Sequence, residues 1–296
     1  MGQLTAPFPY FGGKRRAAEL VWSRFGDVPN YVEPFCGSCA VLLARPHKPR
    51  IETVNDIDGL LVNFWRAVAF DPEAVTKHVL WPVTELDLHA RHKWLLGHRD
   101  SITELLRADP EYYDAKAAGW WCGGATSCIG DWLASQNEIR GLPHLGNAGK
   151  GPNRPTLSGS DVLNWLRELS VRLENTRVCC GSFERVLTDS ATTLHGDTAV
   201  FLDPPYDAEG HDKGMYISYG NVASKAAEWA FENGDNPKFR IALCGYAGEH
   251  APPKGWTCSS WKARKGYGSQ ANTERERIWF SPHCLQVSLF DLDETA

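Results

Sequence analysis

The sequence predicts an α/β fold built on a mixed, mainly parallel sheet, and three observations indicate it. Short apolar runs at residues 51–54, 176–180, 199–202 and 239–244 have the length and composition of buried strands. Longer segments with helical periodicity separate several of these runs. Two of the runs end in polar turns, at Asn55-Asp56 and at Asp203-Pro204. Open α/β sheets bind ligands beside the carboxyl ends of their strands, so these two turns are the candidate functional sites.

The remaining elements follow from periodicity and turn signals along the chain. A short strand, a turn rich in small residues and a helix are expected within residues 30–43, and a further strand near Trp279. We expect helices at residues 14–24, 39–44, 58–68 and 160–173. Residues 291–296 are expected to form a frayed acidic tail.

Residues 71–158 have a different organisation from the segments on either side. They contain helical stretches at 85–96, 101–108 and 112–118, followed by a loop-rich segment at 120–157. We interpret residues 71–158 as an inserted, mostly helical domain. The core is then made of residues 1–70 together with 159–296.

Composition sets the outer limits of function. The chain has 296 residues, of which 43% are hydrophobic and 23% charged, which suits a globular protein with a full α/β core and an inserted subdomain. No apolar run approaches the roughly 20 residues that span a bilayer, and no signal peptide precedes the first motif. We therefore expect no membrane association and a cytoplasmic location.

The nine cysteines do not predict a metal site. Cys36 and Cys39 have CxxC spacing, but no second pair completes a zinc site with them. Reduced thiols are the expectation in a cytosol.

The turn after the strand at 199–202 is the most informative segment, and its residues are Asp203, Pro204, Pro205 and Tyr206. Two prolines prevent any continuation of a strand or helix, so the chain must turn there. Asp203 and the Pro204 carbonyl can accept the two hydrogens of an exocyclic amino group, and Tyr206 can stack on a planar base. The alternative is a structural turn, since Asp and Pro are ordinary turn residues.

A second candidate site lies in the turn at residues 33–39. Small residues let the backbone approach a nucleotide-like ligand, with the amino end of a helix behind it. Asp56 follows Gly37 by about 20 residues, the offset at which an acid meets ribose hydroxyls in βαβ nucleotide sites. Turn, strand and acid together favour an adenosine-bearing cofactor.

Three motifs occur in the order of a known family. They are residues 8–14 (Phe-Pro-Tyr-Phe-Gly-Gly-Lys), residues 33–39 (Glu-Pro-Phe-Cys-Gly-Ser-Cys) and residues 203–206 (Asp-Pro-Pro-Tyr). The chain resembles the Dam-type, D12-class (alpha group) DNA adenine-N6 methyltransferases of phages and restriction systems, over roughly residues 7–70 and 175–282. The resemblance implies a Rossmann-like class I methyltransferase core, S-adenosylmethionine as methyl donor, and an inserted target-recognition domain.

The resemblance also assigns roles to individual residues. It implies that Asp203, Pro204, Pro205 and Tyr206 are catalytic. The cofactor contacts that it implies are Tyr10, Gly12, Gly13, Lys14, Glu33, Pro34, Phe35, Cys36, Gly37, Asp56, Ser182, Phe183 and Asp203. For Lys14, a surface lysine at a helix start is the alternative. The family often has a second glycine where this chain has Cys39, and we expect the turn to persist because cysteine is small.

The expected reaction is direct methyl transfer to the N6 amino group of an adenine that is flipped out of duplex DNA. Hydrogen bonds accepted from both amino hydrogens would offset the positive charge that develops on the nitrogen. Neither a metal ion nor a covalent enzyme intermediate is needed.

The net charge of −5 implies that any DNA contact depends on local basic patches. Two loops qualify, at residues 140–155 and 261–268, with solvated loops as the alternative. Their candidate DNA-binding residues are Arg140, Lys150, Arg154, Lys262, Arg264 and Lys265. The family branch also suggests a bacterium or a phage-infected host cell as the setting, and a cognate restriction endonuclease as a further partner.

Two other functions compete with adenine methylation. One is methylation of another amino group, on cytosine, RNA or protein glutamine, and the other is a non-catalytic DNA-binding or decoy protein on the same fold. An Asn or Ser in place of Asp203 would favour glutamine or cytosine, so the aspartate favours adenine. The presence of Asp203, Tyr206 and Asp56 argues against a decoy.

Overall fold

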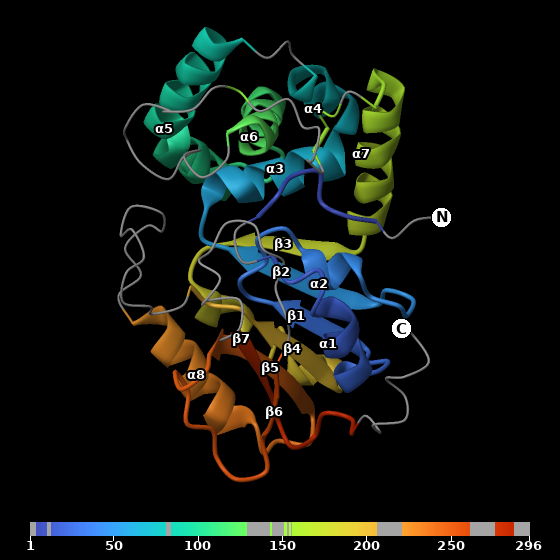
Figure 1. Cartoon of the computed structure of the whole chain (residues 1–296), viewed down its shortest axis with the longest axis vertical. Helices are drawn as coiled ribbons and strands as arrows, with labels where there is room; N and C mark the ends of the chain where they lie inside the picture. The colour runs from blue at the N-terminus through green and yellow to red at the C-terminus, as the bar shows by residue number, and fades with distance from the viewer. Residues whose placement is uncertain are drawn as a thin grey trace.

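The computed structural model describes residues 4–10, 13–80, 84–128, 143, 151–152, 154, 156–205, 221–260 and 276–286. Its centre is a seven-stranded sheet with the order β3-β2-β1-β4-β5-β7-β6 (Figure 1). The strands are β1 (Asn30–Glu33), β2 (Ile51–Asp56), β3 (Thr176–Cys180), β4 (Thr198–Leu202), β5 (Phe239–Tyr246), β6 (Thr257–Ser260) and β7 (Glu276–Phe280). Strands β1 to β5 pair in parallel, whereas β7 is antiparallel to both β5 and β6. The predicted α/β fold with a mixed, mainly parallel sheet is confirmed.

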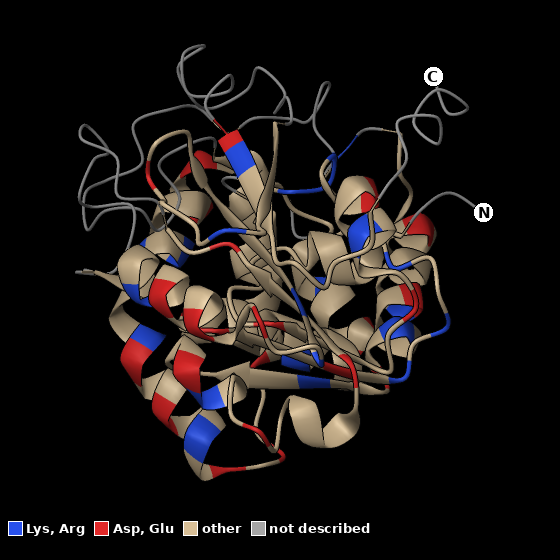
Figure 2. Cartoon of the chain, turned by 90° about the horizontal axis from the view of Figure 1, so that it is seen from below, with Lys and Arg blue, Asp and Glu red and all other residues tan. Residues whose placement is uncertain are grey.

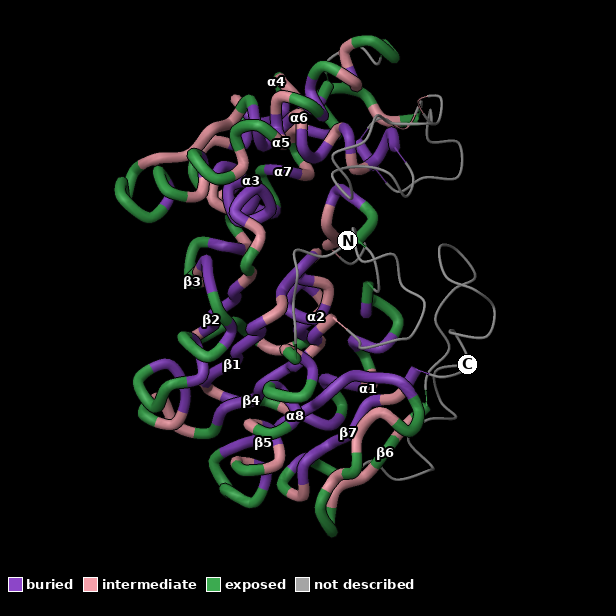
Figure 3. Tube along the Cα trace, turned by 90° about the vertical axis from the view of Figure 1, so that its left-hand side faces the viewer, coloured by how far each residue is buried: buried purple, intermediate pink, exposed green. Residues whose placement is uncertain are grey.

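Alternating side chains of β4 and β5 divide the core of the sheet into two layers. Phe201 and Cys244 belong to the cluster that includes α1 (Ala18–Phe25) and α2 (Ala40–Leu43). Leu202 and Leu243 belong to a second cluster, with α8 (Val222–Asn233) and the short 3-10 helix η1 (Phe183–Val186). A second 3-10 turn, η2 (Thr193–His195), precedes β4. The central strands are therefore buried on both faces, as Figure 3 shows along β1, β4 and β5.

Five helices form a separate layer along the β3 edge of the sheet (Figure 1). They are α3 (Gly59–Phe70), α4 (Pro72–Val79), α5 (Glu85–Ala108), α6 (Ala115–Ser127) and α7 (Gly159–Leu173). Several begin at side-chain caps: Asp58 accepts from the Leu60 N–H in α3, and Ser158 and Asp161 form a capping box in α7. Helices α3 and α7, which flank the predicted insert, pack against its helices as well as against β3.

The amino-terminal segment connects this helical layer with the sheet. The Phe8 ring lies 5.1 Å from the Phe64 ring of α3 and 4.7 Å from the Trp121 ring of α6. The Trp165 indole of α7 donates to the Thr5 carbonyl at 2.7 Å. These contacts fix the start of the 8–14 motif before it reaches the carboxyl ends of the strands.

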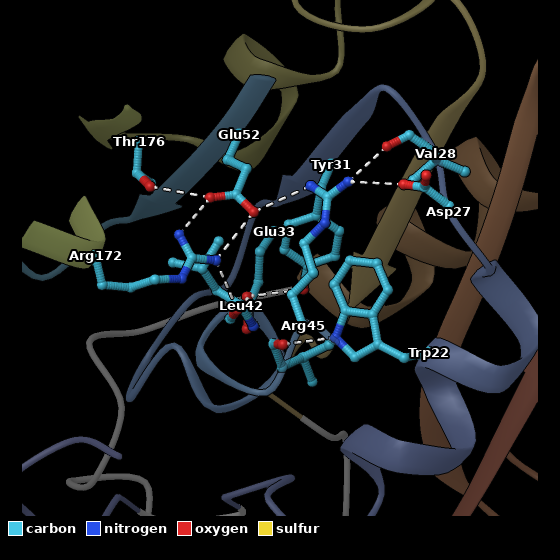
Figure 4. Close-up of polar contacts among 11 residues, drawn as sticks. Trp22, Asp27, Val28, Tyr31, Glu33, Leu42, Arg45, Glu52, Arg172 and Thr176 are labelled. Carbon is cyan, nitrogen blue, oxygen red and sulfur yellow. Dashed lines mark hydrogen bonds and ion pairs between the residues drawn. The ribbon is translucent and has the colours of Figure 1, made fainter. Parts of the chain in front are cut away.

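A buried ion-pair network ties the amino ends of the strands to the helices around them (Figure 4). Glu52 of β2 is fully buried and accepts from Arg45 at 3.0 Å and from Arg172 of α7 at 2.6 Å. Thr176 of β3 donates to the same carboxylate at 3.2 Å. Arg45 also donates to the Val28 carbonyl, so the network joins the entry to β1 with β2, β3 and α7. Paired in this way, the charges are tolerated inside the fold.

Some predicted boundaries are wrong, each for a local reason. Helix α1 begins at Ala18 instead of residue 14, because residues 13–17 form backbone turns and no side chain caps the helix earlier. The predicted helices at 85–96 and 101–108 are one helix, α5, since Gly97 is exposed and costs an exposed helix only about 1 kcal/mol. Helix α6 begins at Ala115 instead of residue 112, and it continues to Ser127, into the segment predicted as loop.

Two further observations concern the cysteines and the hydropathy of the helices. All nine cysteines are free thiols, and seven of them are buried. No helix in the described part of the chain is both long and apolar enough to cross a membrane.

Candidate active site at the carboxyl edge of the sheet

The predicted turns meet where the strand order changes direction. β1 pairs with β2 on one side and with β4 on the other. Helix α2, which follows β1, packs in one core layer of the sheet, and α8, the next described helix after β4, packs in the other. Open α/β sheets bind their ligands at this kind of position. The turn at residues 33–39 follows β1, and Asp203 follows β4 directly.

The turn at residues 33–39, here called the glycine turn, packs against Tyr10 of the 8–14 motif. Gly37 has φ +44°, and a Cβ added there would lie 2.5 Å from the Tyr10 ring, so only glycine fits. The Trp65 indole of α3 donates to the Gly37 carbonyl at 3.0 Å. The turn at residues 33–39 and Tyr10, which are distant in sequence, therefore lie together, and we call them the glycine cradle. The Tyr10 ring is half-exposed at its surface.

Cys39 occupies a second left-handed position in this turn. Its φ is +50°, and its N–H donates to the Cys36 carbonyl at 2.6 Å, directly before α2. The frequent glycine of the family at this position is explained by that backbone conformation. The turn persists with cysteine, as expected, at a backbone cost of about 1–2 kcal/mol.

Asp56 lies at the end of β2 beside the glycine turn. Its carboxylate accepts from the Gly37 N–H at 3.1 Å and from the Asp58 N–H at 3.0 Å. Burial, reinforced by the charge of Asp58, raises the pKa of the Asp56 carboxyl to about 6. A carboxylate has about four acceptor positions, so Asp56 retains capacity for hydroxyl donors of a ligand.

Asn55 connects the turns that follow three strands, and sequence reasoning did not nominate it. Its buried amide donates to the Pro34 carbonyl at 3.0 Å and to the Gly181 carbonyl at 2.9 Å. The Asn55 carbonyl in turn accepts from the Cys36 N–H at 2.9 Å. An Asn before an Asp at a strand end is the signal that could have identified this bridge.

Two aromatic side chains, Phe35 and Phe183, lie beside Asn55. The rings of Phe35 and Phe183 lie 5.1 Å apart and are tilted by 31°, with Phe183 almost fully buried. Ser182 is exposed, and its hydroxyl donates to the Glu184 carboxylate. The predicted adenine-packing residues are therefore adjacent to the cradle, on the side of η1.

Lys14 and Asp203 form a buried ion pair at the end of β4. Lys14 Nζ lies 2.9 Å from Asp203 Oδ1 and 3.7 Å from Glu276 Oε2 of β7. Lys14 is only 3% exposed, so the alternative of a surface lysine is wrong. Burial alone would lower the pKa of Lys14, but the negative charges of Asp203 and Glu276, together with Cys244, raise it above its ordinary value. Pro204 beyond the pair is buried and Pro205 half-buried.

Glu33 faces the interior of the protein below the turn. Its carboxylate accepts from the Tyr31 hydroxyl at 2.8 Å and from the Leu42 N–H of α2 at 3.2 Å. Burial, with repulsion from Asp203 and Glu52, raises the pKa of Glu33 to about 8. These contacts fix the start of α2 behind the cradle.

Comparison with known proteins agrees with this geometry. Residues 10–101 match the family model described as D12 class N6 adenine-specific DNA methyltransferase. The chain is also 25% identical over 191 residues to the retron Ec67 DNA adenine methylase of Escherichia coli, which covers 60% of this chain and 55% of that protein. The chain thus spans just over half the length of this curated relative. The resemblance to the D12 class is confirmed. The mixed, mainly parallel sheet is consistent with the class I methyltransferase fold.

The match to the D12 class contains the glycine turn and Asp56 but not Asp203. Several predicted site residues lie outside the described residues: Gly12, Tyr206, Arg140, Lys150, Lys262, Arg264 and Lys265. Arg154 is described, and its guanidinium donates to the Gly151 carbonyl at 3.1 Å and lies over the Trp165 ring. Acidic and basic residues are interspersed along the helices in Figure 2.

Proposed function

We propose that this D12-class protein transfers a methyl group from S-adenosylmethionine to the N6 amino group of a flipped-out adenine in duplex DNA. The observation that carries the proposal is the Asp203 carboxylate, held by buried Lys14 at the end of β4 and adjacent to the glycine cradle. The descriptions of the matching family and of the retron relative both name DNA adenine methylation.

The residues of the cradle fit S-adenosylmethionine. Gly37 lets the Tyr10 ring pack directly on the backbone of the turn, where the ring would contact the cofactor, Asp56 would accept from ribose hydroxyls, and Phe35 with Phe183 would flank the adenine. The excess of carboxylates over cations around Lys14 suits a ligand that carries a sulfonium and an ammonium charge. When bound, the cofactor supplies an electrophilic methyl group. The protein must then supply orientation and charge.

Asp203 and the carbonyl of Pro204 would accept the two hydrogens of the amino group. Because the lone pair of this nitrogen is delocalised into the ring, both hydrogen bonds favour a more nucleophilic nitrogen and offset its developing charge. The ion pair with Lys14 keeps Asp203 ionised and fixes its orientation. Alignment of the acceptor nitrogen with the reacting carbon is the other contribution.

Flipping the base costs a few kcal/mol, and one aromatic stack returns about 1–3 kcal/mol. The predicted stack on Tyr206 therefore roughly balances that cost, and the hydrogen bonds to Asp203 and Pro204 supply the surplus. Duplex DNA is the proposed partner, with the basic loops at 140–155 and 261–268 as its predicted contacts. A cognate restriction endonuclease and a cytoplasmic location stay predictions.

The test is transfer of labelled methyl from S-adenosylmethionine to duplex DNA, followed by product analysis. We expect label in N6-methyladenine with the wild type and a loss of at least about 100-fold with Asp203→Ala. Asp235→Asn, a change at an exposed acid after α8, should keep full activity. Label on cytosine, RNA or protein would show that adenine in DNA is not the substrate. Binding of DNA without transfer to any acceptor would favour the non-catalytic function.

A further inference from the structure

Glu276 lies beside the buried Lys14–Asp203 ion pair, and the proposed mechanism gives its side chain no individual role. It is the first residue of β7, and its side chain is 10% exposed. β7 is antiparallel to the rest of the sheet, so its first residue lies at the same edge as the carboxyl ends of β4 and β5. A carboxylate from the far end of the chain is thereby placed beside the Lys14–Asp203 pair.

One lysine serves two carboxylates in this cluster. Lys14 Nζ contacts Asp203 at 2.9 Å and lies 3.7 Å from Glu276 Oε2. An ammonium group carries three donors and a single charge, so the two acids and the lysine together carry a net charge of −1. With only one acid the pair would be neutral.

Among the described residues, Lys14 is the one cation within ion-pair distance of the Glu276 carboxylate. On β5, Tyr246 lies opposite it in the ladder and Cys244 is near Lys14. Glu33 of β1 contributes a further acid near Asp203. The neighbouring Arg277 guanidinium donates to the Glu276 backbone carbonyl instead of the carboxylate. Within the described residues, the buried Glu276 Oε2 accepts no hydrogen bond.

Burying the Glu276 carboxylate in this arrangement destabilises the fold. Burial raises the pKa of Glu276, and repulsion from Asp203 adds a smaller contribution; the attraction of Lys14 offsets the two only in part. A buried carboxylate oxygen that accepts no hydrogen bond is uncommon because it loses its hydration. An acid that only supported the fold would be better replaced by an uncharged side chain.

We propose that Glu276 is a positioning residue for methyl transfer, which shares the Lys14 ammonium with Asp203 so that Asp203 keeps its strength as a hydrogen-bond acceptor. The inference rests on the proposed function. Without Glu276, Lys14 would pair with Asp203 alone and neutralise the carboxylate that faces the amino group. Glu276 would thus act on the reaction only through Lys14.

The first readout does not depend on activity. Carboxyl carbons of glutamate are labelled with 13C and titrated by NMR, and the signal lost in Glu276→Gln identifies Glu276. We expect the pKa of Glu276 to fall in Asp203→Asn, because the repelling charge is removed while Lys14 stays. An unchanged pKa of Glu276 would show that the two acids are not coupled and would overturn the inference.

The second readout is kinetic. In Glu276→Gln we expect kcat to fall about 10- to 100-fold, with KM for S-adenosylmethionine changed less than threefold, and Glu276→Asp to recover part of kcat. The wild-type kcat should decline toward acid pH as Glu276 protonates, and this component should be missing in Glu276→Gln. Asp56 and Glu33 titrate in both proteins, so only the difference between the two profiles reports Glu276.

The matched control is Glu73→Gln, the same chemical change in an exposed ion pair with Arg167. It should leave kcat and the pH profile unchanged. Equal kcat values and profiles for wild type and Glu276→Gln would show a structural acid and overturn the inference. If the wild type transferred no methyl group to DNA, the proposed function would fail, and the NMR titration would still decide whether Glu276 and Asp203 share Lys14.

Discussion

The two ends of the sheet treat buried acids in opposite ways. At the amino ends, the carboxylate of Glu52 has two guanidinium partners, Arg45 and Arg172, and a hydroxyl donor (Figure 4). At the carboxyl ends, Asp203 and Glu276 share the single ammonium of Lys14. A buried acid that is fully paired destabilises the fold when one partner is removed, whereas acids in excess of their cations leave charge for a ligand. The contrast supports the proposed site at the carboxyl edge.

Strand β2 contains the same contrast within six residues. Glu52 near its start is paired with arginines, while Asp56 at its end has only backbone N–H donors among the contacts described above. The pKa of Asp56 is raised to about 6 chiefly by burial. The fold therefore tolerates an unpaired acid where a ligand would compensate it.

The largest expected effect on stability comes from removing the Glu52 carboxylate from the ion-pair network at the amino ends of the strands. Glu52→Gln leaves the buried guanidinium of Arg45 without its carboxylate, and we expect the free energy of unfolding to fall by about 3–5 kcal/mol. Urea denaturation measures the change. Glu73→Gln, at an exposed ion pair, is the control and should unfold at nearly the wild-type urea concentration. A small effect of Glu52→Gln would contradict the structural role of the network.

The second prediction concerns the pH dependence of stability at Glu33. Its folded pKa of about 8 lies above the ordinary value of 4.5, so the folded protein binds the proton more tightly than the unfolded chain. This contribution to stability is present at low pH and is lost as pH rises toward 8. We expect Glu33→Gln to reduce the fall in unfolding free energy between pH 5 and pH 8 by about 2–4 kcal/mol, measured by urea denaturation. Parallel curves for the two proteins would contradict the prediction.

The smallest expected effect on stability comes from replacing Gly37 in the glycine cradle. Gly37→Ala and Gly248→Ala both place alanine at positive φ, but only Gly37 has a ring, that of Tyr10, within contact distance of the new Cβ. Both should lose about 1–2 kcal/mol of stability. Gly37→Ala alone should weaken S-adenosylmethionine binding in calorimetry, by about tenfold or more. Equal affinities in the two variants would place the cofactor elsewhere.

Much of the sheet could be predicted from the sequence because its central strands are buried on both faces. β4 and β5 are apolar runs bounded by polar turns, and their predicted positions agree with the structure to within two residues, as does that of the edge strand β3. β6 was missed because Thr257–Ser260 is a polar edge strand with alternating exposure. Helix α8 also carries no side-chain cap to mark its start. Helix α4 had a readable signal, an Asp cap followed by proline at the first turn.

The site could be predicted only in part. Lys14, Gly37, Asp56 and Asp203 each lie in a turn with local signals, and the structure brings them to one edge. Glu276 was not nominated, because its role depends on the antiparallel direction of β7, which places the start of that strand at the site. That pairing is a long-range property that no local pattern encodes.

The most direct test compares both ends of the sheet in one experiment. Methyl transfer to adenine per folded molecule and the free energy of unfolding are measured for Asp203→Asn and Glu52→Gln. We predict that Asp203→Asn loses transfer by at least about 100-fold and stays close to wild-type stability, whereas Glu52→Gln loses stability and keeps transfer in its folded fraction. Undiminished transfer by Asp203→Asn would contradict the assignment of the active site to the carboxyl edge.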